Sequence, residues 1–265
     1  MRLFKKKIGL ALGAGGARGL AHIGVIKELE KNSIAIDYIT GSSIGALIGG
    51  LYAYTKDIKC IEELAYSSNY KMFIHAFSDL SLKSAFFNGE KILDFLDPYI
   101  PDSALIQDTK IPFAAVATNM ITAQSVILKE GNLKQAIRAS MSLPIILKPI
   151  KYNNMLFMDG GVVNPVPIRA AKELGAQKII GVNLYGNLFP RNYDNEDLTI
   201  ADSFWTLLDA SSYDIAAQNM KEADVQINLP TGASVSLTSF AKNPKEFIEI
   251  GEKETLKNIN KLKSL

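Results

Sequence analysis

Within its first 55 residues the chain repeats one arrangement twice: a short apolar run, a glycine-rich turn and a helical pattern. The strand, turn and helix lie at 8–12, 13–16 and 20–29 in the first unit, and at 36–40, 41–43 and 44 to about 54 in the second. Consecutive units of this kind place parallel strands between layers of helices. We therefore predict an α/β fold with a parallel sheet.

The alternation of strands and helices continues through the rest of the chain. Strand patterns recur at 112–118, 125–128, 150–152, 155–158, 178–184 and 224–229, and helical patterns at 132–140, 167–174, 200–220 and from 244 onward. Residues 185–199 are rich in Asn, Asp, Gly and Pro, which predicts a surface loop. We predict a single domain over 1–265, in which a core at about 8–167 carries the motifs and 168–265 completes the same domain.

The segment between residues 57 and 97 is helical in pattern but irregular. It contains a cluster of aromatic side chains at Tyr70, Phe73, Phe77, Phe86 and Phe87. We predict that this segment forms a cap or lid.

The composition excludes several classes of protein. Lys and Arg number 29 against 27 Asp and Glu, a net charge of +2, so no general attraction to nucleic acid is expected. The single cysteine, Cys60, allows neither an intrachain disulfide nor a zinc site built from cysteine pairs. We predict a protein of the reducing cytoplasm that has no nucleic-acid partner.

Two segments imitate membrane signals. Residues 1–16 combine a basic start with a short apolar run, as a secretory signal does, but the run is diluted by glycine. We assign it to the fold. Residues 38–55 carry no charge over 18 positions, but their first part is a strand and a Gly-Ser turn. The helix that remains is too short to span about 30 Å of hydrocarbon, and we place it in the core.

The most informative motif is Gly41-Ser42-Ser43-Ile44-Gly45, which matches the G-x-S-x-G pattern of a serine nucleophile between a strand and a helix. Gly41 and Gly45 would let strand and helix approach each other without Cβ clashes. The N-terminus of the helix favours negative charge that develops beside it. Ser43 is therefore the predicted nucleophile, and its neighbour Ser42 is predicted to be structural.

A serine nucleophile needs a base, and the chain contains only two histidines, His22 and His75. In the usual α/β-hydrolase order the histidine follows both serine and acid, but no histidine occurs after position 75. We expect His22 to be a buried structural imidazole and His75 a surface residue. A carboxylate acting directly on the serine remains. Asp159, which a predicted strand delivers to a Gly-Gly turn, is the best-placed candidate, although Asp-Gly is also a common turn dipeptide.

The glycine-rich loop at 13–19 can present consecutive backbone N–H groups to an anion. A dinucleotide fits poorly, because Arg18 stands where the G-x-G-x-x-G pattern needs its last glycine, and Asp37 lies near the start of its strand. A P-loop is excluded because no Gly-Lys-Ser/Thr follows. The alternative anion is the oxyanion of a tetrahedral acyl intermediate, for which the Gly15 and Gly16 amides would be donors.

Taken in this order, the three motifs resemble those of the patatin-like phospholipase family, specifically its short bacterial members. The family's Gly-Gly-Gly-x-Arg/Lys-Gly loop corresponds to 14–19, with Ala14 in place of the first glycine. Its G-x-S-x-G serine corresponds to Ser43, and its Asp-Gly-Gly/Ala aspartate to Asp159. Residues 137–144 resemble the Arg-Ala-Ser-x-x-x-Pro segment that lines the family's active site. The resemblance covers about residues 8–167.

The resemblance implies a three-layer α/β/α sandwich with a mainly parallel central sheet. It implies a Ser43–Asp159 dyad that cleaves fatty acyl esters of phospholipids or lysophospholipids through an acyl-enzyme, without metal or cofactor. The oxyanion hole would be formed by Gly15 and Gly16, on a loop supported by Arg18 and Gly19. We expect Arg18 to tie the loop down rather than to face a phosphate head group.

Other substrates and roles stay open at this point. The same dyad would serve a thioesterase or a short-chain carboxylesterase, because the pocket alone sets chain length. In a further alternative the fold is a non-catalytic regulatory module. We expect a cytoplasmic protein, at most peripheral at the membrane, that meets lipid transiently through Phe73, Phe77, Phe86 and Phe87. The sequence leaves the natural substrate and the oligomeric state undetermined.

Overall fold

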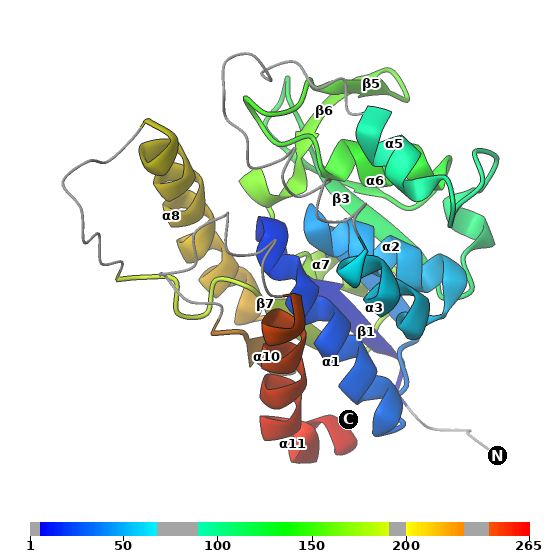
Figure 1. Cartoon of the computed structure of the whole chain (residues 1–265), viewed down its shortest axis with the longest axis vertical. Coiled ribbons are helices and arrows are strands. Elements are labelled where there is room, and N and C mark those ends of the chain that lie inside the picture. Colours follow the sequence, from blue (N-terminus) through cyan, green and yellow to red (C-terminus); the bar gives the residue numbers. More distant parts are fainter. Residues whose placement is uncertain (1–5, 68–89, 191–199, 231–243) are drawn as a thin grey trace.

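A central β-sheet organises the computed structural model, which describes residues 6–67, 90–190, 200–230 and 244–265. The strands in these ranges are β1 Ile8–Leu12, β2 Tyr38–Ser42, β3 Phe113–Asn119, β4 Ser125–Leu128, β5 Ile150–Tyr152, β6 Met155–Asp159, β7 Lys178–Asn183 and β8 Val225–Asn228. They follow the order β5-β6-β3-β2-β1-β7-β8, with β4 also paired to β3 (Figure 1). The five strands from β3 to β8 in this order are parallel, whereas β4, β5 and β6 pair in antiparallel fashion.

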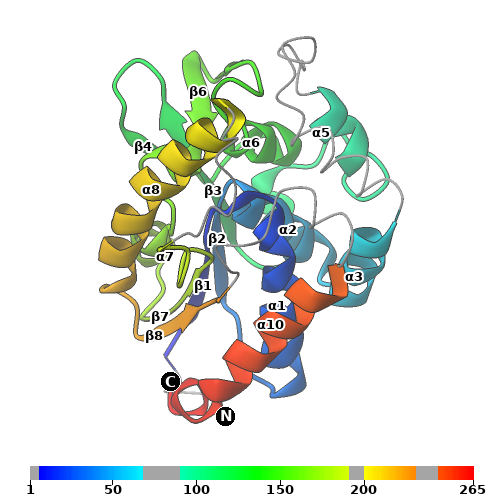
Figure 2. The same ribbon diagram turned by 60° about the vertical axis from the view of Figure 1, so that its left-hand side comes forward.

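Helices cover both faces of this sheet. Those in the described ranges are α1 Leu20–Lys31, α2 Ile44–Thr55, α3 Ile58–Tyr66, α5 Glu90–Leu96, α6 Leu133–Ser140, α7 Ile168–Glu173, α8 Ile200–Met220, α10 Pro244–Lys257 and α11 Ile259–Lys263, with 3₁₀ turns η1 Gly16–Gly19, η2 Ile106–Asp108 and η3 Gly160–Val162. In Figure 2, α7 and α8 lie on one side of the sheet, and α1, α2 and α10 lie on the other. The protein is thus a three-layer α/β/α sandwich, which confirms the predicted fold class.

The strand β1 shows why the sheet needs both helical layers. Every residue of β1 is buried. Leu10 and Leu12 belong to the large apolar cluster that includes α1 and α2, whereas Ala11 belongs to a second cluster with residues of α7 and α8. Successive side chains of a strand point to opposite faces, so a strand that is apolar on both faces lies between two layers. The apolar run that imitates a signal segment is therefore a central strand.

The predicted elements agree with the structure except at a few boundaries. The bounds of β4, β5 and α8 are those that the sequence predicts. The strand predicted at 36–40 lies two residues later, as β2 at Tyr38–Ser42. Its end is set by pairing, because Gly41 pairs with Leu12 of β1 and Ser42 pairs with Val116 of β3. The strand thus continues to Ser42. The predicted turn shrinks to Ser43, which sharpens the change of direction into α2.

Residues 185–190 contain no helix or strand, and Gly186, Asn187 and Pro190 are exposed, as in the surface loop that the composition predicts. Tyr185 and Leu188 are both buried, and they belong to the apolar cluster of α7 and α8. The rest of the predicted loop, at 191–199, lies outside the described residues. So do His75 and the members of the predicted lid cluster, Tyr70, Phe73, Phe77, Phe86 and Phe87.

The uncharged run at 38–55 divides between β2 and α2. The 12 residues of α2 span about 18 Å. In the part of the chain that the structure describes, no helix combines the length and the apolar character needed to cross a bilayer.

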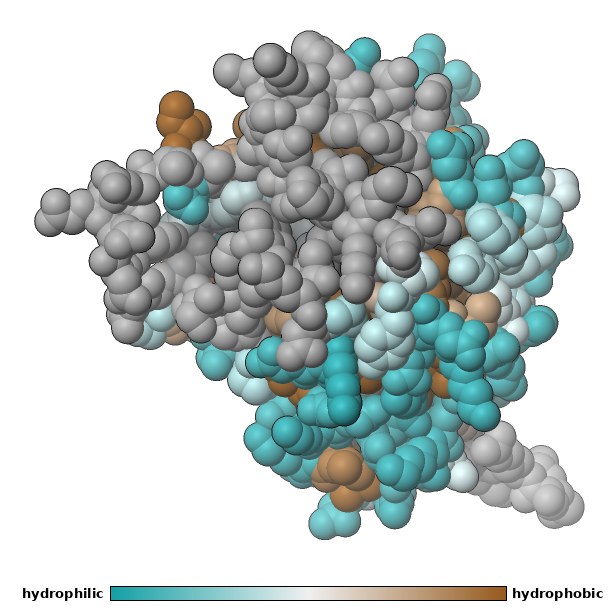
Figure 3. All heavy atoms as spheres, viewed as in Figure 1, coloured by the Kyte–Doolittle hydropathy of each residue, from teal (hydrophilic) through white to brown (hydrophobic). Residues whose placement is uncertain are grey.

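Figure 3 shows that hydrophilic residues predominate on the surface over α10 and α11.

Candidate active site

A single residue, Ser43, forms the turn between β2 and α2. Its backbone adopts φ 54° and ψ −123°, a conformation that strains any residue other than glycine. The neighbouring glycines permit the sharp turn, since a Cβ at Gly41 would lie 2.3 Å from the Gly45 carbonyl oxygen. A Cβ at Gly45 would lie 2.2 Å from the Leu12 carbonyl oxygen. The spacing of the motif therefore reflects close backbone approach on both sides of Ser43.

The register of β3 brings Asp159 to this turn. Ser42, the last residue of β2, pairs with Val116 of β3, and Asp159, the last residue of β6, pairs with Ala117. The opposite edge of β3 is occupied by β4, which pairs with both Val116 and Ala117. Because β2 and β6 share one edge of β3, β6 begins its pairing where β2 ends. Asp159 is consequently placed directly beyond Ser42.

The side chains of Ser43 and Asp159 are in contact. Ser43 Oγ donates a hydrogen bond of 2.6 Å to Asp159 Oδ2, and the Gly161 N–H donates one of 2.7 Å to Oδ1. Asp159 is only 2% exposed. Burial raises the pKa of this carboxyl to about 6, although its two hydrogen bonds act in the opposite direction. Both carboxylate oxygens are thus held in fixed directions, one of them toward the serine.

Residues near the end of α6 hold the backbone of both groups. The Ser43 N–H donates to Ser140 Oγ at 2.9 Å, and the fully buried Ser140 hydroxyl donates to the Val116 carbonyl at 2.6 Å. The Asp159 N–H donates to the Ser142 carbonyl at 2.9 Å. Sequence reasoning noted the segment 137–144 but did not assign these contacts. The resemblance of this segment to one that lines the active site of a known family was the only signal in the sequence for these contacts.

In the glycine-rich loop, some backbone N–H groups bind other parts of the fold and others have no partner. The Gly13 N–H donates to the Val182 carbonyl at 3.0 Å, and the Ala14 N–H donates to the Pro165 carbonyl at 2.8 Å. Within the described ranges, the Gly15 and Gly16 N–H groups have no acceptor. The Ala14 amide, which stands where the family has its first glycine, is therefore bound to the fold and is not a free donor.

The two glycines are set in place by their surroundings. Gly16 has φ +58°, and no described atom lies within 4 Å of the position a Cβ would take there. Gly15 packs so closely that a Cβ would lie 2.6 Å from Leu184 Cδ1. Arg18 Nε donates to the Gly15 carbonyl at 2.9 Å, and Arg18 is buried. Arg18 thus binds the loop at the Gly15 carbonyl.

The remaining candidate base does not reach the serine. His22, on α1, is fully buried, and its Nε2 lies 2.8 Å from the Gly13 carbonyl oxygen. Burial lowers the pKa of His22 to about 4, so at neutral pH the uncharged ring donates this hydrogen bond. His22 is the structural imidazole that the sequence predicts, and it supports the start of the glycine loop.

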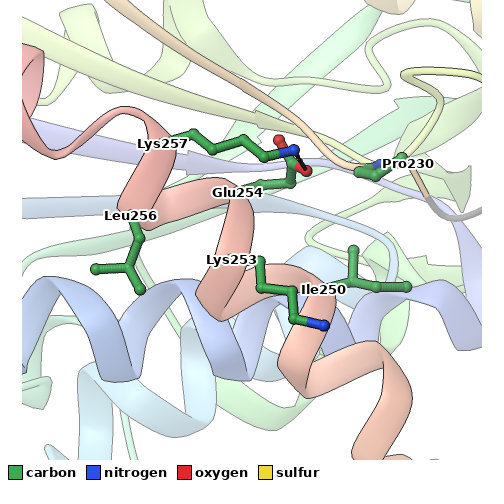
Figure 4. Close-up of a pocket in the computed structure, with 6 residues that line it drawn as sticks. All are labelled: Pro230, Ile250, Lys253, Glu254, Leu256 and Lys257. Atoms are coloured by element: carbon green, nitrogen blue, oxygen red, sulfur yellow. Dashed lines mark hydrogen bonds and ion pairs between the residues drawn. The ribbon is translucent and has the colours of Figure 1, made fainter.

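Other features of the described residues do not join this site. Among the described residues, no group of three or more His, Cys, Asp and Glu side chains is arranged so that it could hold a metal ion. A surface hollow of about 530 Å³ is lined by Pro230, Ile250, Lys253, Glu254, Leu256 and Lys257 (Figure 4). It takes no residue from the loops that carry Ser43, Asp159 or Gly15.

Comparisons with known proteins show which sequences this chain resembles. The sequence model for patatin-like phospholipases matches residues 10–172. An uncharacterized NTE family protein of Mycobacterium tuberculosis is 37% identical over 184 residues, which cover 68% of this chain and 50% of that protein. Lysophospholipase NTE1 of Debaryomyces hansenii is 31% identical over 249 residues, which cover 91% of this chain and 16% of that protein. This chain therefore spans at most half the length of these relatives.

A solved structure shares the fold at low sequence identity. VipD from Legionella pneumophila superposes with a TM-score of 0.55 at 13% identity, over 98% of this chain and 67% of the VipD chain. The likeness covers the three layers as a whole, including the strands and helices beyond residue 172.

Proposed function

The chain belongs to the patatin-like phospholipase family, and from this premise we propose that it is a serine acyl hydrolase with Ser43 as nucleophile and Asp159 as base. The observation that carries the proposal is the 2.6 Å hydrogen bond between the serine hydroxyl and a buried carboxylate. A hydroxyl becomes nucleophilic when a base takes its proton during attack, and Asp159 Oδ2 is the acceptor at this hydroxyl.

The proposed reaction has two halves. Ser43 Oγ attacks the carbonyl carbon of an acyl ester while its proton passes to Asp159, and the carbonyl electrons move onto the carbonyl oxygen. Collapse of this intermediate expels the alcohol, which takes the proton from Asp159, and leaves the acyl group on Ser43. Water then attacks the acyl-enzyme and gives a proton to Asp159. The fatty acid leaves as Ser43 regains that proton.

The environment of Asp159 suits the role of base. A carboxylate with an ordinary pKa is a weak base at neutral pH, whereas burial raises the pKa of Asp159 to about 6. The group is then still ionised near pH 7 but binds a proton more readily. The Gly161 N–H keeps Oδ1 engaged, so Oδ2 is the oxygen that accepts the serine proton.

We assign the oxyanion hole to the N–H groups of Gly15 and Gly16. Both groups lack an acceptor among the described residues, and the loop packs against the start of α2 through Gly19, where a Cβ would lie 2.2 Å from Ile44 Cγ1. Two preset donors stabilise charge on the oxygen without reorganisation at the moment of reaction. Removal of one such donor typically raises the barrier by about 2.7–4 kcal/mol.

For the substrate we propose fatty acyl esters of phospholipids or lysophospholipids. The name of the Debaryomyces hansenii relative, a lysophospholipase, supports this class. We place the activity in the cytoplasm, at the surface of a membrane that the protein contacts transiently. The half-exposed thiol of Cys60, which is free, is compatible with a reducing compartment.

The proposed function is tested by labelling and by turnover. A fluorophosphonate probe, which reacts with activated serines, should label the protein at Ser43, as peptide mass spectrometry would show. A panel of phospholipid, lysophospholipid, acyl-CoA and short p-nitrophenyl esters should then show the fastest turnover for the first two. Preference for acyl-CoA would indicate a thioesterase, and preference for short esters a carboxylesterase. Absence of both labelling and turnover would indicate the non-catalytic module.

The pKa of Asp159 predicts the pH profile of the reaction. Only the ionised carboxylate accepts the serine proton, so kcat/KM should fall about tenfold per pH unit below about pH 6 and level off above it. The measurements are kcat/KM and the fluorophosphonate labelling rate, which should follow the same profile, between about pH 4.5 and 8.5, with circular dichroism at each pH to verify folding. A rate that stays constant from about pH 5 to 8 in folded protein would contradict the assignment of Asp159.

A further inference from the structure

We propose that Asp209, on α8, is a positioning residue for the oxyanion loop, residues 13–19, and that it acts on this loop through Arg18. The inference rests on the proposed hydrolase function, because it concerns the donors of the oxyanion hole. Asp209 lies beyond residues 10–172, which match the family model, and no motif in the sequence points to it.

The guanidinium of Arg18 is held by three different groups. Its Nη2 lies 2.5 Å from Asp209 Oδ1, and its Nε donates to the Gly15 carbonyl at 2.9 Å. Its Cζ lies 5.0 Å from the centre of the Tyr185 ring. The side chains of Arg18 and Asp209 are only 9% and 15% exposed, so little water screens this ion pair. The charge of Arg18 is therefore committed to the fold and not to a substrate phosphate.

The contact with Gly15 determines the direction of a proposed donor. A peptide unit is planar and trans, so the carbonyl of Gly15 and the N–H of Gly16 point in opposite directions within one rigid plane. Arg18 binds this unit at its carbonyl. Fixing the carbonyl therefore fixes the Gly16 N–H, which has no acceptor among the described residues. Asp209 in turn fixes the guanidinium of Arg18. Two contacts, Asp209–Arg18 and Arg18–Gly15, therefore connect Asp209 to the proposed oxyanion hole.

The same helix also contacts the turn that follows the base. Ser212, one helical turn after Asp209, donates from Oγ to the Gly161 carbonyl at 3.3 Å. The N–H of Gly161 is the group that binds Asp159 Oδ1. Residues three apart lie on one face of a helix, so this face of α8 contacts both the oxyanion loop and the Asp159 turn. Figure 2 shows α8 in the layer that covers this side of the sheet.

The first test is Asp209→Asn, which keeps the shape of the side chain but removes its charge. We expect kcat for a lysophospholipid or p-nitrophenyl ester to fall about 10- to 100-fold, with KM changed less than about twofold, because the donor is misdirected and substrate binding is not. Affinity for a trifluoromethyl ketone, whose adduct with Ser43 places an oxyanion in the same hole, should fall by a similar factor. Active sites are counted by complete fluorophosphonate labelling.

The matched control is Asp214→Asn, the same substitution on an exposed residue of the same helix. It should keep wild-type kcat and wild-type affinity for the ketone. Loss of activity in this control equal to that in Asp209→Asn would overturn the proposal, since any loss of charge on α8 would then have the same effect. Inactivity of the wild-type protein itself would overturn the proposed function together with this inference.

A double variant separates positioning from simple charge balance. Asp209→Asn leaves the buried Arg18 without an opposite charge and can lower stability for that reason alone. Arg18→Met combined with Asp209→Leu removes both charges, so the fold should persist, but the Gly15 carbonyl still lacks its donor. We expect this variant to melt near the wild-type temperature and to keep the losses of kcat and ketone affinity. Recovery of wild-type kcat would show that the pair only neutralises charge and would overturn the proposal.

Discussion

Replacing Ser43 by alanine should lower the turnover of acyl esters by at least about a thousandfold, while the protein stays folded. The substitution removes the oxygen that attacks the substrate in the proposed mechanism, and it adds no volume to the turn. Alanine is no more strained than serine at φ 54°, and the Ser43 N–H keeps its bond to Ser140. The measurement is kcat/KM on the ester that the wild-type protein hydrolyses fastest, with circular dichroism as the check on folding.

Glycine at the same position provides a second, opposite readout. Ser43→Gly should be as inactive as Ser43→Ala, but it should be more stable than the alanine variant by about 1–3 kcal/mol, because glycine adopts this backbone conformation without strain. Chemical denaturation of the two variants measures the difference. Turnover above about a tenth of the wild-type value in either variant would remove Ser43 from the mechanism. Equal stabilities would show that the turn is not strained.

Asp159→Asn should abolish turnover without unfolding the protein, with a loss of at least about a thousandfold in kcat/KM. The amide oxygen can still accept the Gly161 N–H, but the amide nitrogen that faces Ser43 cannot take up a proton. The fluorophosphonate labelling rate should fall in parallel. A stable Asp159→Asn variant that labels as fast as the wild-type protein would show that another group activates the serine.

The same variant has a predicted effect on stability, and its sign follows from the raised pKa. The pKa of Asp159 rises from 3.8 to about 6 on folding, so the ionised form destabilises the folded state. The loss of folding free energy is absent below about pH 4, grows between about pH 4 and 6, and is complete above that range. A pKa difference of about two units corresponds to about 3 kcal/mol. Asp159→Asn should therefore melt at the same or a higher temperature than the wild-type protein at pH 8, and the two should converge near pH 4. A large loss of stability at pH 8 would identify Asp159 as a structural turn residue.

Local sequence signals predicted most of the fold because each of them depends on neighbours along the chain. The strand β1, the helix α2 and the hairpin of β5 and β6 follow from hydrophobic period and turn residues. The strained turn at Ser43 follows from its flanking glycines, since no other residue type fits the approach of strand and helix there. Where the signals failed, at the end of β2, pairing with β3 decided the structure. The burial of Tyr185 and Leu188 against α7 and α8 likewise depends on packing between segments that lie far apart in the chain.

Sequence patterns alone predict the α/β class, the serine turn, the glycine loop and the Asp-Gly-Gly turn, because each of these depends on a few consecutive residues. The family resemblance implied that Asp159 acts on Ser43, but the hydrogen bond between their side chains, across 116 residues of sequence, is seen only in the folded structure. The same holds for the contact of the Ser43 N–H with Ser140 and for that of Arg18 with Asp209 of α8. These contacts depend on the register of strands and the packing of helices that lie far apart in the chain. No local pattern encodes such pairings, because they arise from the hydrogen bonds and buried surfaces of the whole sheet.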